Sequence, residues 1–234
     1  MHSKWVNGAL VFYEGQRWFD AIGPNVCKFL EDFVGTRFAT ADNMAGWTTT
    51  LVEAGVGETT VAPVTSWTGG AVVITTDANE NDGANLQLLG EAFKLVSGKP
   101  LYFGIKFQAS EATQSDFFAG LAITDTDILG GVTDSIGFRK VDGSTDVKFH
   151  LNKNSTETES ANIHTFAAAT DVTLEFLFDG TNIDSYVNGA LQTRLAMANL
   201  PDDEDLTPSI QFLSGAAGAK SMTIDWIRVI QIQS

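Results

Sequence analysis

The sequence predicts an all-β protein, a sandwich of two antiparallel sheets preceded by an N-terminal arm with one short helix. Apolar and polar residues alternate along Leu101–Gln108, Val147–Asn152 and Val172–Asp179, the pattern of strands with one buried face. Asp-Gly and Asn-Gly pairs separate several such segments. The strands number about a dozen, which favours two packed sheets over one flat sheet.

Further strands are predicted throughout the 234-residue chain. Ala9–Tyr13 lies in the arm, and the others lie in the body: Thr48–Val52, Ala71–Thr76, Leu86–Leu89, Ala92–Val96, Phe117–Ile123, Ser209–Leu213 and Met222–Ile232. Hairpin turns are expected at Asp142-Gly143, Asp179-Gly180 and Asn188-Gly189, because a type I′ turn needs a positive φ at both central positions.

Residues 1–45 form the predicted arm, and residues 46–234 form the predicted sandwich domain. The arm holds four basic and five acidic side chains and 8 of the 24 aromatic residues, whereas the body has a net charge of −14. Within the arm, Val26, Phe29, Leu30, Phe33 and Val34 recur at helical spacing. Asn25 and Gly35 can begin and end this helix, so we expect a helix over residues 25–34.

Composition excludes several classes of function. The formal net charge of −15 would repel a phosphate backbone and an anionic lipid surface, so neither a nucleic acid nor a membrane is an expected partner. A single cysteine, Cys27, excludes an internal disulfide and a multi-thiolate metal site. No secretory signal or spanning segment is present, which predicts a soluble protein made in the cytoplasm and not secreted.

Few residues are candidates for catalysis or metal binding, and no catalytic residue or cofactor is predicted. His150 falls on the polar face of its strand and is expected to be a solvated surface histidine, while Cys27 is expected to be a buried structural thiol. Asp77, Asn79 and Asp82 resemble part of a calcium loop, but Gly83 falls one place late and Leu88 stands where the bidentate glutamate belongs. A solvated turn is therefore favoured over a calcium site.

Two stretches of the body resemble concanavalin A-like (laminin G-like) jelly rolls. These are Val172–Gly189, with its D-G turn and its Y-V-N-G strand end, and the last strand Met222–Val229, which is also similar to that of laminarinase-type glycoside hydrolases. Those enzymes carry their two carboxylates as E-x-D-x-E or E-x-D-x-x-E on one strand face. Glu175–Asp179 has the wrong spacing, and Glu157–Glu159 is expected in a polar loop, so glycosidase activity is not predicted.

A second resemblance points to a different role. Asp116–Asp127 with Ile136–Phe138, and Phe19–Phe33 in the arm, look like virion structural proteins of tailed bacteriophages. The resemblance implies a non-enzymatic capsid decoration (cement) protein on the exterior of the phage head, with the major capsid protein and further copies of itself, most simply a trimer, as partners. The alternatives are a lectin-like module that binds host surface glycans and a tail-fibre or baseplate component.

The aromatic residues of the arm are the expected interface of such a protein, because large aromatics bury much area with little loss of rotamer entropy. The predicted interface residues are Trp5, Phe12, Trp18, Phe19, Phe29 and Phe33. The competing interpretation is that these side chains complete the core of the sandwich itself.

Overall fold

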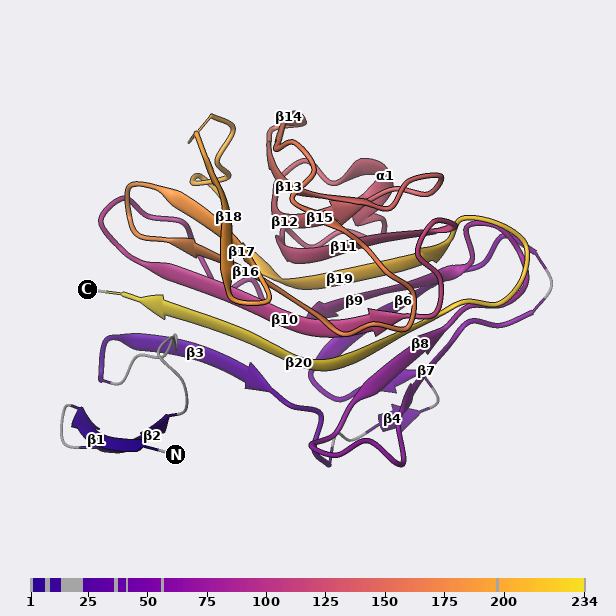
Figure 1. Cartoon of the computed structure of the whole chain (residues 1–234), viewed down its shortest axis with the longest axis horizontal. Helices are drawn as coiled ribbons and strands as arrows, with labels where there is room; N and C mark the ends of the chain where they lie inside the picture. The colour runs from indigo at the N-terminus through magenta and orange to yellow at the C-terminus, as the bar shows by residue number, and fades with distance from the viewer. Residues whose placement is uncertain are drawn as a thin grey trace.

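Two antiparallel sheets of eight strands each form the body of this computed structural model (Figure 1). The structure describes residues 2–6, 9–13, 23–35, 38–40, 42–55, 57–196 and 198–233, and for residues 2–6, 9–13 and 38–40 it describes the backbone only. The all-β, two-sheet prediction is confirmed. Among the described residues, no helix has the length and apolar character needed to cross a membrane.

The first sheet, called sheet B here, has the strand order β18-β17-β16-β10-β20-β8-β7, and β3 also pairs with β20. Its strands are β3 (Val26–Glu31), β7 (Thr60–Pro63), β8 (Val72–Thr75), β10 (Leu101–Ala109), β16 (Val172–Phe178), β17 (Ile183–Val187), β18 (Ala190–Leu195) and β20 (Ser221–Ile232). The long strand β20 lies between β10 on one side and both β8 and β3 on the other.

The second sheet, called sheet D here, has the strand order β14-β13-β12-β11-β19-β9-β6, and β15 also pairs with β13. Its strands are β6 (Trp47–Val52), β9 (Gly83–Leu88), β11 (Ser115–Ala122), β12 (Ser135–Lys140), β13 (Asp146–Lys153), β14 (Thr156–Glu159), β15 (His164–Thr165) and β19 (Thr207–Ser214). Two small ribbons, β1 (His2–Val6) with β2 (Ala9–Tyr13) and β4 (Phe38–Thr40) with β5 (Asn43–Met44), complete the strands.

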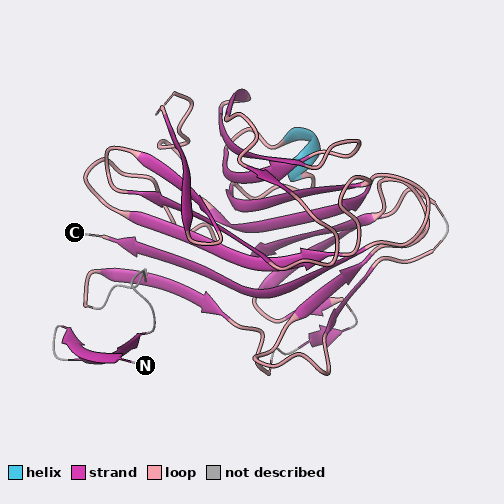
Figure 2. Ribbon diagram, viewed as in Figure 1, coloured by secondary structure: helices cyan, strands magenta, loops and turns pink. Residues whose placement is uncertain are grey.

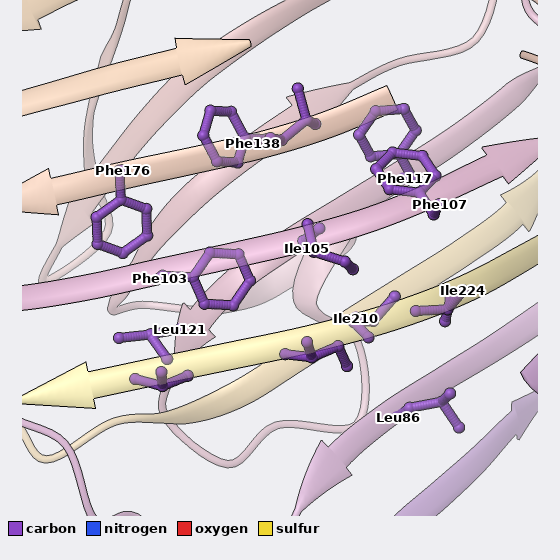
Figure 3. Packing of buried hydrophobic residues seen from close by; sticks show 14 of the residues in the cluster. Leu86, Phe103, Ile105, Phe107, Phe117, Leu121, Phe138, Phe176, Ile210 and Ile224 are labelled. Carbon is purple, nitrogen blue, oxygen red and sulfur yellow. The ribbon is translucent and has the colours of Figure 1, made fainter. Parts of the chain in front are cut away.

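The core lies between the two sheets and consists of the alternating apolar side chains that define the strands (Figure 3). Phe107 of sheet B meets Phe117 of sheet D edge to face, with ring centroids 5.1 Å apart, and Phe103 stacks on Phe176 at 5.4 Å. Full burial of such a side chain contributes roughly 1.5–3 kcal/mol. The inward faces that the sequence pattern predicts are therefore the faces that hold the sandwich together.

The predicted helix over residues 25–34 is wrong, because Val26–Glu31 is strand β3. It pairs with Ile227–Ile232 of β20, and its inward residues Cys27 and Phe29 pack against the core. The helical spacing of apolar residues in this segment coincides with the alternation of an edge strand. Part of the predicted arm thus belongs to sheet B, and whether residues 1–45 act as an interface stays a prediction.

Among the described residues, the only helix is α1 (Ile128–Gly131), four residues long (Figure 2). It begins after Asp127, whose side chain accepts a hydrogen bond from the Gly130 backbone N–H. The predicted turn at Asn188-Gly189 is confirmed, with φ of 48° and 80° at the two residues. The predicted strand at Ala92–Val96 is replaced by two isolated bridges, at Phe93 and at Val96.

Candidate functional site

The candidate site lies on the face of sheet D that points away from the core. In β13 the residues Val147, Phe149 and Leu151 are buried in the core, so Lys148, His150 and Asn152 point to the other side. In β14, Glu159 is paired with His150 and Glu157 with Asn152. Because directly paired residues share a face, the two glutamates lie on the same side as His150.

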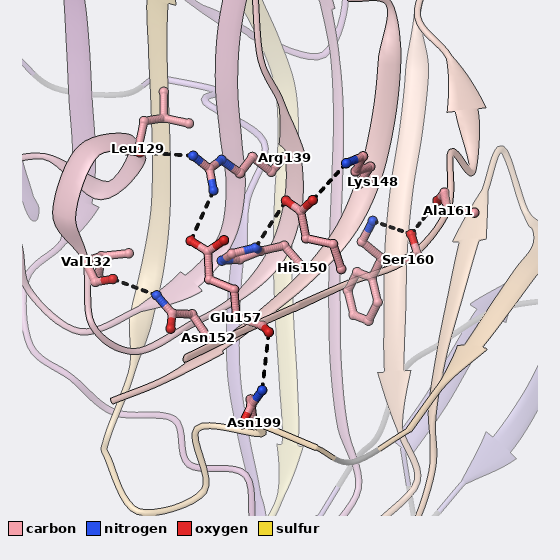
Figure 4. Close-up of polar contacts among 12 residues, drawn as sticks. Leu129, Val132, Arg139, Lys148, His150, Asn152, Glu157, Ser160, Ala161 and Asn199 are labelled. Atoms are coloured by element: carbon pink, nitrogen blue, oxygen red, sulfur yellow. Dashed lines mark hydrogen bonds and ion pairs between the residues drawn. The ribbon is translucent and has the colours of Figure 1, made fainter. Parts of the chain in front are cut away.

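Two cations hold the two carboxylates in place (Figure 4). Arg139 Nη1 lies 3.3 Å from Glu157 Oε1, and Lys148 Nζ lies 2.9 Å from Glu159 Oε2. The second oxygen of Glu159 faces His150, with 3.6 Å between Oε1 and the imidazole Nδ1. One ligand-type atom from each of His150, Glu157 and Glu159 lies within 4.8 Å of the others.

A loop with α1 at its centre covers the neighbouring part of this face. Its backbone is tied down by buried amide side chains: Asn85 Nδ2 donates to the Asp125 carbonyl at 2.7 Å, and Gln211 Oε1 accepts from the Leu129 N–H at 2.7 Å. Underneath, Ile128 and Val132 join Phe118 in a small separate apolar cluster. On one side of the His150 ring, the α1 loop therefore covers the outer face of sheet D.

A pocket of about 320 Å³ remains between this loop and β14. Its lining comprises Phe118, residues 128–132, Arg139, His150, Asn152, Ser155 and Glu157. Three buried side-chain atoms here have no hydrogen-bond partner in the structure: Arg139 Nε, His150 Nδ1 and Asn152 Oδ1. Buried polar atoms are nearly always bonded to protein or water, so this group of atoms indicates a place for water or a ligand.

The protonation states in the site follow from burial and charge. Burial lowers the pKa of His150 and the positive charge of Arg139 lowers it further, whereas the charges of Glu157 and Glu159 and the polar contact with Glu159 raise it; the net pKa lies below its usual value. Burial raises the pKa of Glu159, but the hydrogen bond and charge of Lys148, together with the charges of His150 and Arg139, lower it by more. The net pKa of Glu159 lies below its usual value, and the group is an anion at pH 7.

Two sequence predictions about this region are wrong. His150 is not a solvated surface residue, since it is only 2% exposed under the α1 loop. Glu157–Glu159 is not in a loop but in strand β14, and even spacing on that strand aims both carboxylates at His150. Sequence reasoning could have found the pair from the E-x-E spacing, but Thr156–Glu159 contains no apolar residue that marks a strand.

The predicted interface residues are placed only in part. Trp18 and Phe19 lie outside the described residues. Trp5 lies in β1 and Phe12 in β2, and for both residues the structure describes the backbone only. Phe33 is 3% exposed and belongs to the core, while Phe29 meets Trp47 edge to face at 5.7 Å. For Phe33 and Phe29 the competing interpretation, completion of the sandwich core, agrees with the structure.

The loop with the calcium candidates Asp77, Asn79 and Asp82 is held by hydrogen bonds to Asp82 from its own Asn79 and from Ala54 of another segment. Asp82 Oδ1 accepts from the Ala54 N–H at 2.6 Å, and Oδ2 accepts from the backbone and side-chain nitrogens of Asn79 at 3.1 Å. Burial raises the pKa of Asp82, but these hydrogen bonds lower it by more. The donors around this carboxylate satisfy it as an anion and give the loop a structural role.

Comparisons with known proteins bear on the fold. No family model matches the chain, and no curated protein matches its sequence. An endo-1,3-beta-glucanase from Streptomyces sioyaensis is similar in structure, with a TM-score of 0.62 and 14% identity, over 92% of this chain and 100% of that chain. A Bacillus licheniformis beta-glucanase has a TM-score of 0.58 and 15% identity, over 86% and 97%.

A third similar structure is a family 16 glycoside hydrolase from Bacteroides ovatus, with a TM-score of 0.61 and 10% identity, over 86% of this chain and 99% of that chain. The fold is therefore the concanavalin A-like jelly roll that family 16 glucanases also have, as the residues of the body predict. Identities this low show a shared fold only. The resemblance to phage virion proteins gains no support from these matches and stays a prediction.

Proposed function

We propose that this protein binds carbohydrate without cleaving it, and that a sugar unit occupies the pocket between α1 and β14. The observation that supports the proposal is the mixture of unpaired polar atoms in that pocket. Arg139 Nε is a donor, Asn152 Oδ1 is an acceptor, and both are buried. A sugar hydroxyl is both a donor and an acceptor, so the hydroxyls of a saccharide can form hydrogen bonds with both of these atoms.

The dimensions of the pocket favour a short ligand. A volume of about 320 Å³ stands at the lower end of the range for small-molecule sites. The α1 loop blocks the sheet face on one side, so the pocket suits a terminal unit or a branch better than the interior of a long polymer. The similar structures are named as enzymes of 1,3- and mixed-linkage β-glucans, which makes oligosaccharides of those glucans the first probes.

The two carboxylates favour binding over hydrolysis. Retaining glycosidases need one carboxylic acid that is protonated at the working pH, next to an ionised nucleophile. Here Lys148 lowers the pKa of Glu159 and Arg139 forms an ion pair with Glu157. Because its pKa is lowered, Glu159 is not arranged to keep the proton that the leaving group requires.

A glycan array followed by calorimetry with the purified full chain tests the proposal. We expect binding of at least one β-linked oligosaccharide, lost in Asn152→Ala and in Arg139→Met, and retained in Gln192→Ala, a residue of β18 that does not line the pocket. Circular dichroism verifies that each variant folds. An array without any bound glycan, or binding that survives both pocket variants, would reject the site.

Incubation of the protein with the same oligosaccharides checks the second half of the proposal. We expect no increase in reducing ends. Product release that depends on Glu157 and Glu159 would show that the protein is an enzyme. The location on the exterior of a virion, the major capsid protein as partner and the homotrimer stay predictions, which mass spectrometry of purified particles can test by copy number.

A further inference from the structure

The ribbon of β13 and β14 presents three metal-ligand side chains on one face. His150 is directly paired with Glu159, and Glu157 lies diagonally across the ribbon. Their ligand-type atoms lie within 4.8 Å of one another, a separation that a single ion can bridge with small side-chain rotations. We propose that His150, Glu157 and Glu159 form a binding site for a divalent transition-metal ion, with Zn²⁺ as the ion that fits them best.

The histidine provides the evidence that goes beyond a pair of acidic residues. His150 is 2% exposed, and its Nδ1 lies 3.6 Å from Glu159 Oε1, just beyond hydrogen-bond distance, with no closer partner in the structure. A buried imidazole nitrogen that faces a carboxylate at 3.6 Å without a closer hydrogen bond is unusual, and a metal ion held between the two groups would satisfy both.

The neighbouring cations leave one oxygen of each carboxylate available. Arg139 binds Oε1 of Glu157, and Lys148 binds Oε2 of Glu159, so Oε1 of Glu159 is the atom that faces His150. Metal-ligating carboxylates commonly receive such hydrogen bonds from outer groups, which fix their orientation. Arg139 and Lys148 thus act as positioning residues that hold the carboxylates toward the imidazole.

The ligand set selects the metal. One imidazole and two carboxylates suit Zn²⁺, whereas Ca²⁺ and Mg²⁺ prefer oxygen ligands throughout. Three protein ligands leave a fourth position of a tetrahedral ion unfilled, and His150 and Glu157 also line the 320 Å³ pocket. The open position would face that pocket. The inference does not depend on the proposed saccharide binding, since the metal test contains no saccharide.

Calorimetric titration of the full chain with ZnCl₂, after treatment with a chelator, tests the inference. We expect one Zn²⁺ per chain, and Ca²⁺ in its place should give no comparable binding. Glu159→Gln at the exposed edge should weaken Zn²⁺ binding more than about tenfold, and so should His150→Gln. His164→Gln, which changes a histidine outside the cluster, and Glu204→Gln, which changes an acidic loop residue, are the matched controls and should bind as the wild type does.

Thermal unfolding gives a second readout and protects the test against misfolded variants. Zn²⁺ should raise the unfolding midpoint of the wild type and of His164→Gln, but not that of Glu159→Gln. Absence of binding to the wild type overturns the inference. So does binding that Glu159→Gln and His150→Gln leave unchanged, or that the control variants lose to the same degree.

Discussion

Asp116 is a carboxylate whose charge works against the folded state. It stands in β11, and its Oδ1 accepts a hydrogen bond from the Asp142 N–H at 2.8 Å. Burial raises the pKa of Asp116; that hydrogen bond lowers it, the negative charge of Asp142 raises it, and the charges of Lys140 and Arg139 lower it. The net pKa lies above its usual value, so the folded chain binds this proton more tightly than the unfolded chain does.

The sign of the pH dependence follows from that shift. Between pH 3.8 and the raised pKa, stability contributed by protonated Asp116 is lost as the pH rises. Asp116→Asn keeps the acceptor and removes the charge, so we expect a higher midpoint of thermal unfolding at pH 7. The difference from the wild type should shrink toward pH 4.

Unfolding curves of both proteins from pH 4 to pH 7 measure this effect. Asp146→Asn, at the exposed start of β13, is the control and should leave the midpoint unchanged. A lower midpoint for Asp116→Asn at pH 7 would mean that attraction by Lys140 and Arg139 outweighs the cost of burial.

For His150, the direction of the side chain could be predicted from the sequence, but its burial could not. The alternation in Val147–Asn152 correctly places His150 on the face opposite Phe149. Its burial could not be predicted, because the loop that covers it comes from residues 123–134 and is fastened by Asn85 and Gln211 from other strands. Alternation along one strand indicates direction, whereas exposure depends on what the rest of the chain places above it.

At the level of elements, β3 was missed because two periodicities overlap. Val26, Phe29 and Leu30 satisfy a helical pattern, but Leu30 is 50% exposed in the strand. The deciding interaction is distant in sequence: β20 has twelve residues, and β8 pairs with only Ser221–Ile224. On the same edge, Ile227–Ile232 are paired by β3, which local propensity cannot anticipate.

The pair of strands β11 and β12 depends on two facing glycines. Gly120 is paired with Gly137, and a Cβ atom at Gly137 would lie 2.5 Å from the Ala119 carbonyl oxygen and 2.7 Å from the Gly120 Cα. Both contacts are with backbone, which cannot move aside as a flexible side chain can. The two strands therefore approach each other more closely than any residue with a side chain would allow.

Gly137→Ala should accordingly lower the free energy of unfolding by about 1–3 kcal/mol, the usual cost of overpacking. Urea denaturation measures the change. Gly131→Ala is the matched control, because a Cβ atom at Gly131 meets nothing within 4 Å. Equal stability of the two variants would show that the strands separate at little cost.

For the whole molecule, the fold class was predictable and the strand order was not. Alternation and turn residues such as Asn188-Gly189 predict which consecutive strands pair with each other. As expected, β16, β17 and β18 are neighbours in sheet B. In contrast, β20 lies between β10 and the pair β8 and β3. That order is set by the packing of complete inward faces, which no segment contains by itself.

The position of β3 gives a prediction for truncated chains. Deletion of residues 1–25 keeps β3, whereas deletion of residues 1–35 removes it together with the buried Phe33. We expect the longer deletion to be less stable than the shorter by at least about 3 kcal/mol, the cost of losing one buried phenylalanine. Urea denaturation of the two proteins decides, and equal stability would show that β3 contributes nothing to sheet B.

The central place of β20 also governs the order of events during biosynthesis. Its neighbour β3 stands about 200 positions earlier, so sheet B stays open along the edges of β3, β8 and β10 until Ser221–Ile232 has left the ribosome. Contacts of such long separation form slowly, and exposed strand edges recruit other chains. The nascent polypeptide would consequently be most vulnerable to aggregation just before synthesis reaches β20, when a chaperone would have the greatest effect on yield.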